Sequence, residues 1–235
     1  MVKKTTKNLA DWIYAYSHIN CYLGRDELLW CFDLYSEMLD VFEKYELLIN
    51  AEFIIPSLIW QGPSADCLGK YKHKEIVRKI PSPGKNYMKK DAIKLIDAEQ
   101  NNDSVFFKPY RWEINGYGVI YDKHGNPQCV PDVITIESFL SGNFEIWIET
   151  FYDVWLSHNL NGEPQPEVYQ HNAPRLEQAM QDVEKILGRP PVKGNKDGPE
   201  HSDYCEIHGY QLRNFIDDFD NTIVPIDLWG HVKMD

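Results

Sequence analysis

The stretch from Phe144 to Leu156 constrains the fold of this chain more than any other part of the sequence. Its apolar residues recur at every second position, and successive side chains of a β-strand point to opposite faces. The spacing therefore predicts a strand over residues 144–156 with one face turned to the core. That face would carry Phe144, Ile146, Ile148, Thr150, Tyr152, Val154 and Leu156.

The alternate positions of the same run combine acidic and aromatic side chains, which is unusual for a strand surface that faces only water. Aromatic residues anchor many protein interfaces, and carboxylates complement a basic partner. We therefore predict that these positions bind a protein partner. The alternative is that a helix covers the aromatic residues and buries the strand on both sides. The positions are Glu145, Trp147, Glu149, Phe151, Asp153 and Trp155.

The rest of the sequence predicts an α+β fold in a single domain over residues 1–235. Residues 1–100 are expected to be mainly helical, with a long amphipathic helix over 26–50 and shorter helices over 9–20, 73–79 and 91–99. For residues 53–60 a helical turn and a short strand are both compatible with the sequence.

The hydrophobic period changes to two from residue 104, so residues 104–235 are expected to form a sheet plus a helix. We predict an antiparallel β-meander of about five to six strands, packed with the N-terminal and C-terminal helices. Asn115-Gly116 is expected to form a hairpin turn, because Asn-Gly is a strong signal for one. A helix is predicted over Glu167–Leu187, with a start near Asn172 or Ala173 as the alternative because of Pro174, and a last strand is predicted over 204–212.

The charge of the chain is strongly acidic and unevenly distributed. The formal net charge is −12, and residues 95–235 carry ten basic against twenty-four acidic side chains. Residues 70–94 hold nine Lys or Arg side chains against two acidic ones. An acidic surface repels nucleic acid and anionic membranes and attracts basic proteins. We therefore expect a basic protein partner and no nucleic-acid or membrane partner.

The compartment is predicted from the cysteines and from the absence of apolar runs. No apolar run is long enough to span a bilayer, and the basic beginning lacks the apolar region of a secretory signal. The five cysteines are widely spaced without a C-x-x-C pair, which is typical of reduced thiols. These features favour a cytoplasmic protein, and they do not predict its oligomeric state.

Catalytic signatures are missing from the sequence. It contains no G-x-S-x-G, H-E-x-x-H, P-loop or G-x-G-x-x-G, so no catalytic residue and no cofactor is predicted. One enzymatic alternative stays open, because His201, Asp203, Cys205 and His208 follow closely on one another and His171 could approach them. A metal-dependent hydrolase would need these groups to converge. A regular strand over 204–212 would point Cys205 and His208 to opposite faces.

Three segments resemble bacterial immunity proteins of polymorphic-toxin and contact-dependent inhibition systems. They are the run from Trp147 to Leu156, the loop Asn161-Gly-Glu-Pro-Gln165 and the stretch from Tyr169 to Glu177. The resemblance implies that the chain binds and blocks a cognate toxin without catalysis of its own, and it assigns no individual site residue. We therefore predict an immunity-type protein that neutralises a basic toxin. The hydrolase and a non-catalytic adaptor domain are the alternatives.

Overall fold

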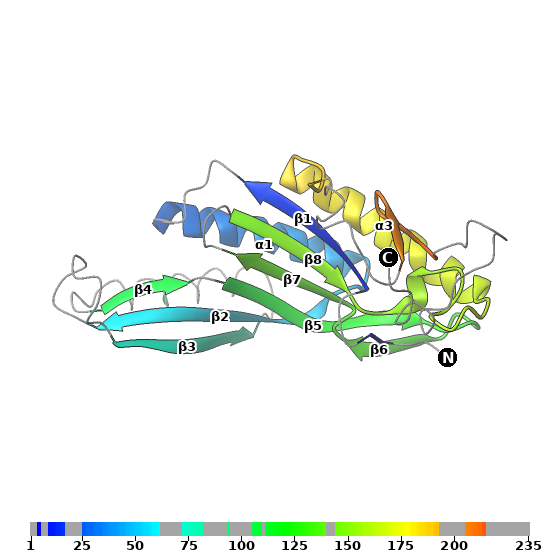
Figure 1. The fold of residues 1–235 in the computed structure, drawn as a ribbon, viewed down its shortest axis with the longest axis horizontal. Helices are drawn as coiled ribbons and strands as arrows, with labels where there is room; N and C mark the ends of the chain where they lie inside the picture. Colours follow the sequence, from blue (N-terminus) through cyan, green and yellow to red (C-terminus); the bar gives the residue numbers. More distant parts are fainter. Residues whose placement is uncertain are drawn as a thin grey trace, which may run out of the picture.

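An eight-stranded antiparallel sheet with two long helices forms the body of the described structure (Figure 1). This arrangement confirms the predicted α+β class. The computed structural model describes residues 4–5, 9–16, 25–61, 72–81, 94, 105–109, 111–139, 144–192 and 205–214.

The strands of the large sheet are β1 (Ala10–Tyr16), β2 (Ile49–Gln61), β3 (Lys72–Pro81), β4 (Val105–Pro109), β5 (Arg111–Tyr121), β6 (Pro127–Pro131), β7 (Ile134–Phe139) and β8 (Phe144–Thr150). The long helices are α1 (Arg25–Lys44) and α3 (Pro166–Leu187). A short 3₁₀ turn, η1 (Asp153–Trp155), follows β8, and β9 (Glu206–His208) pairs with β10 (Gln211–Arg213).

The order of the strands joins the two halves of the sequence. Six strands follow one another in the order β1-β8-β7-β5-β2-β3, while β4 pairs with β2 and β6 pairs with β5. Three of the strands, β1, β2 and β3, come from the first hundred residues. The expectation that residues 1–100 are mainly helical is therefore wrong for the described part of that region.

Strand β1 replaces the helix that the sequence predicted over residues 9–20. It pairs with β8 without interruption, from Ala10 opposite Thr150 to Tyr16 opposite Phe144. Trp12 and Tyr16 lie four residues apart, a spacing that fits one face of a helix and one face of a strand equally well. The pairing with β8, which no local pattern reveals, selects the strand.

Strand β3 likewise replaces the short helix predicted over 73–79. Its residues pair with β2 along ten consecutive positions, from Glu52 opposite Pro81 to Gln61 opposite Lys72. The uncertain segment 53–60 is a strand within β2. Of the helix predicted over 91–99 the structure describes only Lys94, which is helical.

The pairing of β2 with β5 shifts register between Ile49 and Glu52, beside the place where the sequence predicted a hairpin, and we name this irregularity the crease. Strand β5 runs through Asn115-Gly116 without turning, so the predicted turn is wrong. A Cβ on Gly116 would lie 2.8 Å from the Ile49 carbonyl oxygen, and one on Gly118 would lie 2.5 Å from the Leu47 carbonyl oxygen. The glycines at this place therefore allow two strands to approach closely. On the other side of β5, Asp132 adopts a φ of 54° and donates its backbone N–H to Gly116.

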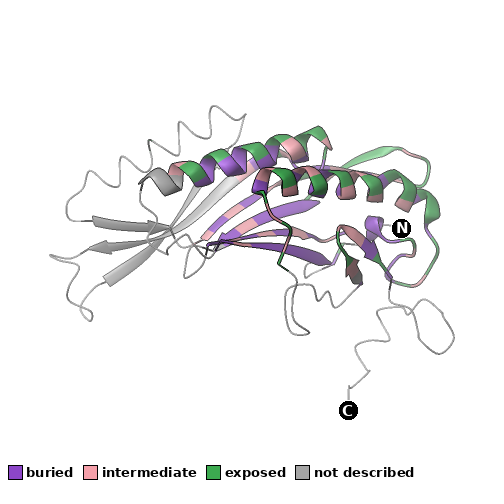
Figure 2. Cartoon of the chain, turned by 90° about the horizontal axis from the view of Figure 1, so that it is seen from above, coloured by how far each residue is buried: buried purple, intermediate pink, exposed green. Residues whose placement is uncertain are grey.

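Helix α1 packs on one face of the sheet and closes the core, as the amphipathic pattern predicted, although it ends at Lys44. The Phe32 ring stacks on Trp112 of β5 with centroids 4.8 Å apart. The Tyr35 hydroxyl forms a buried hydrogen bond with the Ser138 hydroxyl of β7. The buried sides of both long helices face the sheet (Figure 2). Burial of each large apolar side chain here stabilises the fold by about 1.5–3 kcal/mol.

Helix α3 lies on the same side of the sheet as α1 (Figures 1 and 2). It begins at Pro166, one residue before the predicted Glu167, and Pro174 lies inside it, so the alternative start near Asn172 or Ala173 is wrong. It ends where predicted, because Gly188 takes the left-handed conformation with a φ of 66°. The predicted strand over 204–212 is divided into β9 and β10, which turn at Gly209 with a φ of 64°.

Candidate partner-binding face

The face of the sheet opposite the helices carries most of the predicted interface. Along β8, buried residues alternate with half-buried ones, and the half-buried set is Glu145, Trp147 and Glu149. The predicted core face of Phe144, Ile146, Ile148 and Thr150 is buried against the helices. Within the described ranges no helix covers the other face (Figure 2).

The strand predicted over 144–156 is shorter than expected, and this divides the predicted interface residues. Strand β8 ends at Thr150, and the chain then enters η1. Phe151 is half-buried beside the sheet, whereas Asp153 and Trp155 are 0% and 1% exposed. The Trp155 indole N–H donates to the Thr150 hydroxyl at 2.7 Å, and Asp153 accepts the backbone N–H of Leu160. Asp153 and Trp155 therefore belong to the interior and do not share a surface with Trp147.

Neighbouring strands add carboxyl groups around Trp147. Asp11 of β1 lies directly opposite Glu149, and Glu137 of β7 lies directly opposite Trp147. Glu113 of β5 lies opposite Glu137 in turn. Side chains at such opposed positions have Cβ atoms about 4.5–5.5 Å apart. We name this surface the acidic face, and it consists of Asp11, Glu113, Glu137, Glu145, Trp147 and Glu149.

Two basic side chains border the acidic face. The Arg111 guanidinium bonds to the Glu137 carboxylate and lies 3.5 Å from the Glu113 carboxylate. The Lys4 ammonium pairs with Asp132 at 2.9 Å. It also lies within 6 Å of the centres of the Phe151 and Tyr152 rings, at 5.9 and 5.8 Å. The border of this face thus already holds a cation between a carboxylate and aromatic rings.

A hollow of about 380 Å³ opens on the acidic face beside the crease. Its walls come from the N-terminal segment, from β5, β7 and β8, and from the residues that follow or precede these strands. Its size is that of a site for a large side chain or a small molecule. The lining residues are Lys4, Thr5, Glu113, Asn115, Asp132, Thr135, Glu137, Glu149 and Phe151.

Burial disfavours the charged carboxylates on this face. It raises the pKa of Glu149 to about 7, and repulsion from Glu137 adds to the effect. Burial also raises the pKa of Asp11 to about 6. The pKa of Glu137 is raised by burial even though Arg111 acts in the opposite direction. A cation placed beside these groups would favour their ionised forms, so the face is suited to bind positive charge.

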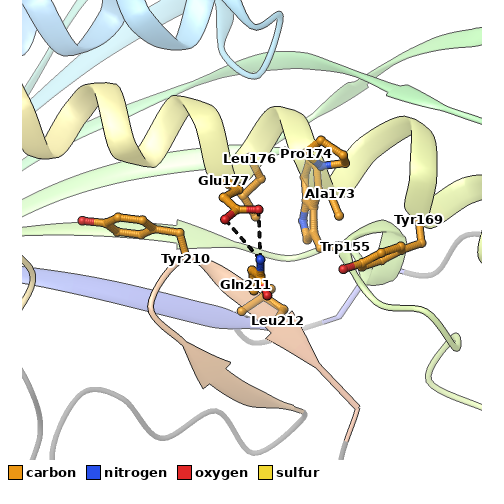
Figure 3. A pocket seen from close by; sticks show the side chains of 9 residues that line it. All are labelled: Trp155, Tyr169, Ala173, Pro174, Leu176, Glu177, Tyr210, Gln211 and Leu212. Atoms are coloured by element: carbon orange, nitrogen blue, oxygen red, sulfur yellow. Dashed lines mark hydrogen bonds between the residues drawn. The ribbon is translucent and has the colours of Figure 1, made fainter.

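A second hollow lies between α3, the buried Trp155 and the β9–β10 hairpin (Figure 3). Its volume is about 40 Å³, which is far below the size of an organic ligand site. The Glu177 carboxylate at its wall accepts hydrogen bonds from the Gln211 amide at 3.1 and 3.2 Å. The hydrogen bonds between Gln211 and Glu177 hold the hairpin to the helix, and the hollow is too small for a substrate.

Three of the residues predicted as metal ligands, Cys205, His208 and His171, are described by the structure, and it does not bring them together into a metal site. The Cys205 thiol is buried and donates to the Leu9 carbonyl, whereas His208 is exposed on β9. His171 lies on α3 beside Gly125. Within the described residues no group of three or more His, Cys, Asp or Glu side chains is arranged to hold a metal ion. His201 and Asp203 lie outside the described residues.

The sequence analysis missed three carboxyl groups of the acidic face: Asp11, Glu113 and Glu137. Each lies on a different strand, so their proximity to Glu149 depends on the strand order and register. The local pattern Arg111-Trp-Glu-Ile is compatible with a strand that has Glu113 and Trp112 on opposite faces. A pattern within one strand cannot show which other strand lies beside it.

Comparison of the chain with protein-family models, curated proteins and solved structures finds no match. None of the helices in the described part of the chain combines the length and apolar character needed to cross a membrane. Any function of the acidic face is therefore inferred from its own geometry and charge.

Proposed function

We propose that this protein is an immunity-type inhibitor that binds a basic protein toxin through the acidic face. The observation that supports the proposal best is the geometry around Trp147. A large aromatic side chain lies among carboxyl groups from four strands, on the face of the sheet that no described helix covers. Tryptophan is common among the residues that contribute most to binding, and the excess of carboxyl groups around it complements a basic partner.

The arrangement of the charges favours a basic protein over a small cation. The Trp147 indole N–H donates to Glu145 at 3.1 Å, which holds the ring against the face. The hollow beside Glu149 adds depth into which a basic side chain can insert. A partner that contributes lysine or arginine side chains and one apolar contact would engage all of these features.

The experiment begins with capture of the partner by the full-length protein from cells that naturally produce it. Binding of the identified partner is then measured for the wild type, Glu145→Lys and Trp147→Ala. The control is Glu37→Lys, which makes the same charge change at an exposed position of α1 on the other side of the molecule. We expect both face variants to weaken binding by at least about tenfold and the control to bind as the wild type does.

The inhibitory role is tested separately by growth. Expression of the captured partner alone should arrest growth of the host cell, and co-expression of the wild type should restore it. Equal binding by the wild type and both face variants would refute the assignment of the interface. A partner that binds at this face without toxicity would favour an adaptor domain over an inhibitor.

A further inference from the structure

Asp11 and Glu149 form a cross-strand pair of carboxyl groups within the acidic face. They lie directly opposite each other on β1 and β8. Asp11 is 6% exposed, and Glu149 is half-buried at the wall of the hollow. Two carboxylates in this position repel each other, and burial makes their charges more costly. Burial and the repulsion between the two groups therefore favour a state in which one carboxyl group of the pair is protonated.

Charged groups from every neighbouring element surround this pair. Glu137 of β7 and Glu113 of β5 add negative charge on one side, and Arg111 of β5 bonds to Glu137 and lies 3.5 Å from the Glu113 carboxylate. Among the described residues, the segments before β1 and before β7 add Lys4 and Asp132, which pair with each other. The Thr135 hydroxyl donates a hydrogen bond to Glu149 at 3.3 Å.

We propose that docking of a cationic side chain at the hollow releases a proton from the pair of carboxyl groups Asp11 and Glu149, chiefly from Glu149 at the wall of the hollow. This inference rests on the proposed binding of a basic partner at the acidic face. A guanidinium or ammonium group beside Glu149 stabilises both carboxylates, so the O–H bond of the protonated carboxyl group breaks and its proton passes to the solvent. The loss of one proton makes the protein more negative by one charge, which balances the single positive charge of the docked side chain.

Proton release makes the affinity depend on pH in a defined direction. Burial raises the pKa of Glu149 to about 7 and that of Asp11 to about 6. Binding should therefore strengthen as the pH rises through these values and become constant above them. With one proton released, the affinity at about pH 8 should exceed that at about pH 6 by roughly tenfold.

The test uses the full-length protein and a capped peptide of alternating arginine and glycine residues. Calorimetric titration in phosphate and in imidazole, two buffers with different ionisation enthalpies, measures the protons released on binding. Glu149→Gln removes the titrating group but keeps an oxygen that can accept from Thr135. Glu145→Gln is the matched control, because it removes one charge from the same face and leaves the pair intact.

We expect the wild type and Glu145→Gln to release close to one proton per bound peptide near pH 6.5, and Glu149→Gln to release almost none. Carbon-13 NMR of the free protein should show a midpoint near 7 for the Glu149 carboxyl group. Binding without proton release, or an ordinary midpoint for Glu149, would overturn the coupling while the docking surface stands. If neither the peptide nor the captured partner contacts the acidic face, the proposed function and the coupling are both wrong.

Discussion

Asn172 of α3 makes both hydrogen bonds that a neighbouring strand would make to the backbone of Tyr121 at the end of β5. Its side-chain amide donates to the Tyr121 carbonyl at 2.8 Å, and its oxygen accepts the Tyr121 N–H at 2.9 Å. The same amide donates to the Val168 carbonyl at 2.8 Å. Because Asn172 is 0% exposed, these bonds fix α3 to the sheet in a setting where water cannot replace them.

Replacement of Asn172 by alanine should lower the free energy of unfolding by about 2–4 kcal/mol. The change leaves the backbone groups of Tyr121 without their side-chain partner, and unsatisfied buried polar groups are costly. Urea unfolding followed by circular dichroism measures the effect. Gln170→Ala on the exposed side of α3 is the control. A loss for Asn172→Ala no larger than for the control would show that α3 is held by its apolar contacts alone.

The crease of the sheet predicts a contrast between two glycines. Gly118→Ala should cost about 3 kcal/mol, because its Cβ would meet the Leu47 carbonyl oxygen at 2.5 Å and the Val133 side chain at 2.6 Å. Gly209→Ala has no neighbouring atom within 4 Å and bears only the strain of its φ of 64°. It should cost about 1–2 kcal/mol. Thermal unfolding of both variants measures the contrast, and Gly118→Ala should lower the melting temperature more than Gly209→Ala does. Equal decreases would mean that the backbone around Gly118 shifts to accept a side chain.

The two tryptophans of the predicted interface should respond in opposite ways to substitution. Trp155 is buried and bonds to Thr150, so Trp155→Ala should cost about 3–5 kcal/mol of stability. Trp147 is half-buried on the open side of the sheet, so Trp147→Ala should cost clearly less and act mainly on binding. Chemical unfolding and partner titration of both variants provide the measurement. Similar losses of stability would place Trp147 in the core rather than at an interface.

Local periodicity was enough to predict the class of fold and several of its elements. The alternation from Phe144 to Thr150 predicted the buried face of β8, and the spacing of residues such as Phe32 and Phe42 predicted α1. Where the prediction failed, the decisive contact was distant in the sequence. Residues 10–16 and 73–79 are strands because β8 and β2 offer them edges to pair with.

The candidate site was predictable only in part for the same reason. Glu145, Trp147 and Glu149 share a face because they alternate within one strand, which the sequence displays directly. After Thr150 the strand ends and the chain enters η1, where the Trp155 indole N–H donates to the Thr150 hydroxyl. This contact lies within the core, and the alternation of the sequence does not reveal it. Asp11 joins the face only through the antiparallel register of β1 with β8.

The buried carboxyl groups predict that stability declines as the pH rises from about 5 to about 8. Burial raises the pKa of Glu149 from 4.5 to about 7, so between these values the folded chain binds more protons at this group than the unfolded chain does. The stabilisation is complete below the unfolded value and is lost as the pH rises through the folded one. Asp11, raised from 3.8 to about 6, acts in the same direction.

The contribution of Glu149 is isolated by comparing the wild type with Glu149→Gln, because the other titrating groups are common to both. Glutamine resembles the protonated carboxyl group, so the two proteins should unfold at similar urea concentrations near pH 5. Near pH 8 the variant should be the more stable by about 1 kcal/mol, less than the full shift implies because water still reaches this side chain. A difference that stays constant from pH 5 to pH 8 would show that Glu149 is ionised throughout, and proton release from this group on binding would then be excluded.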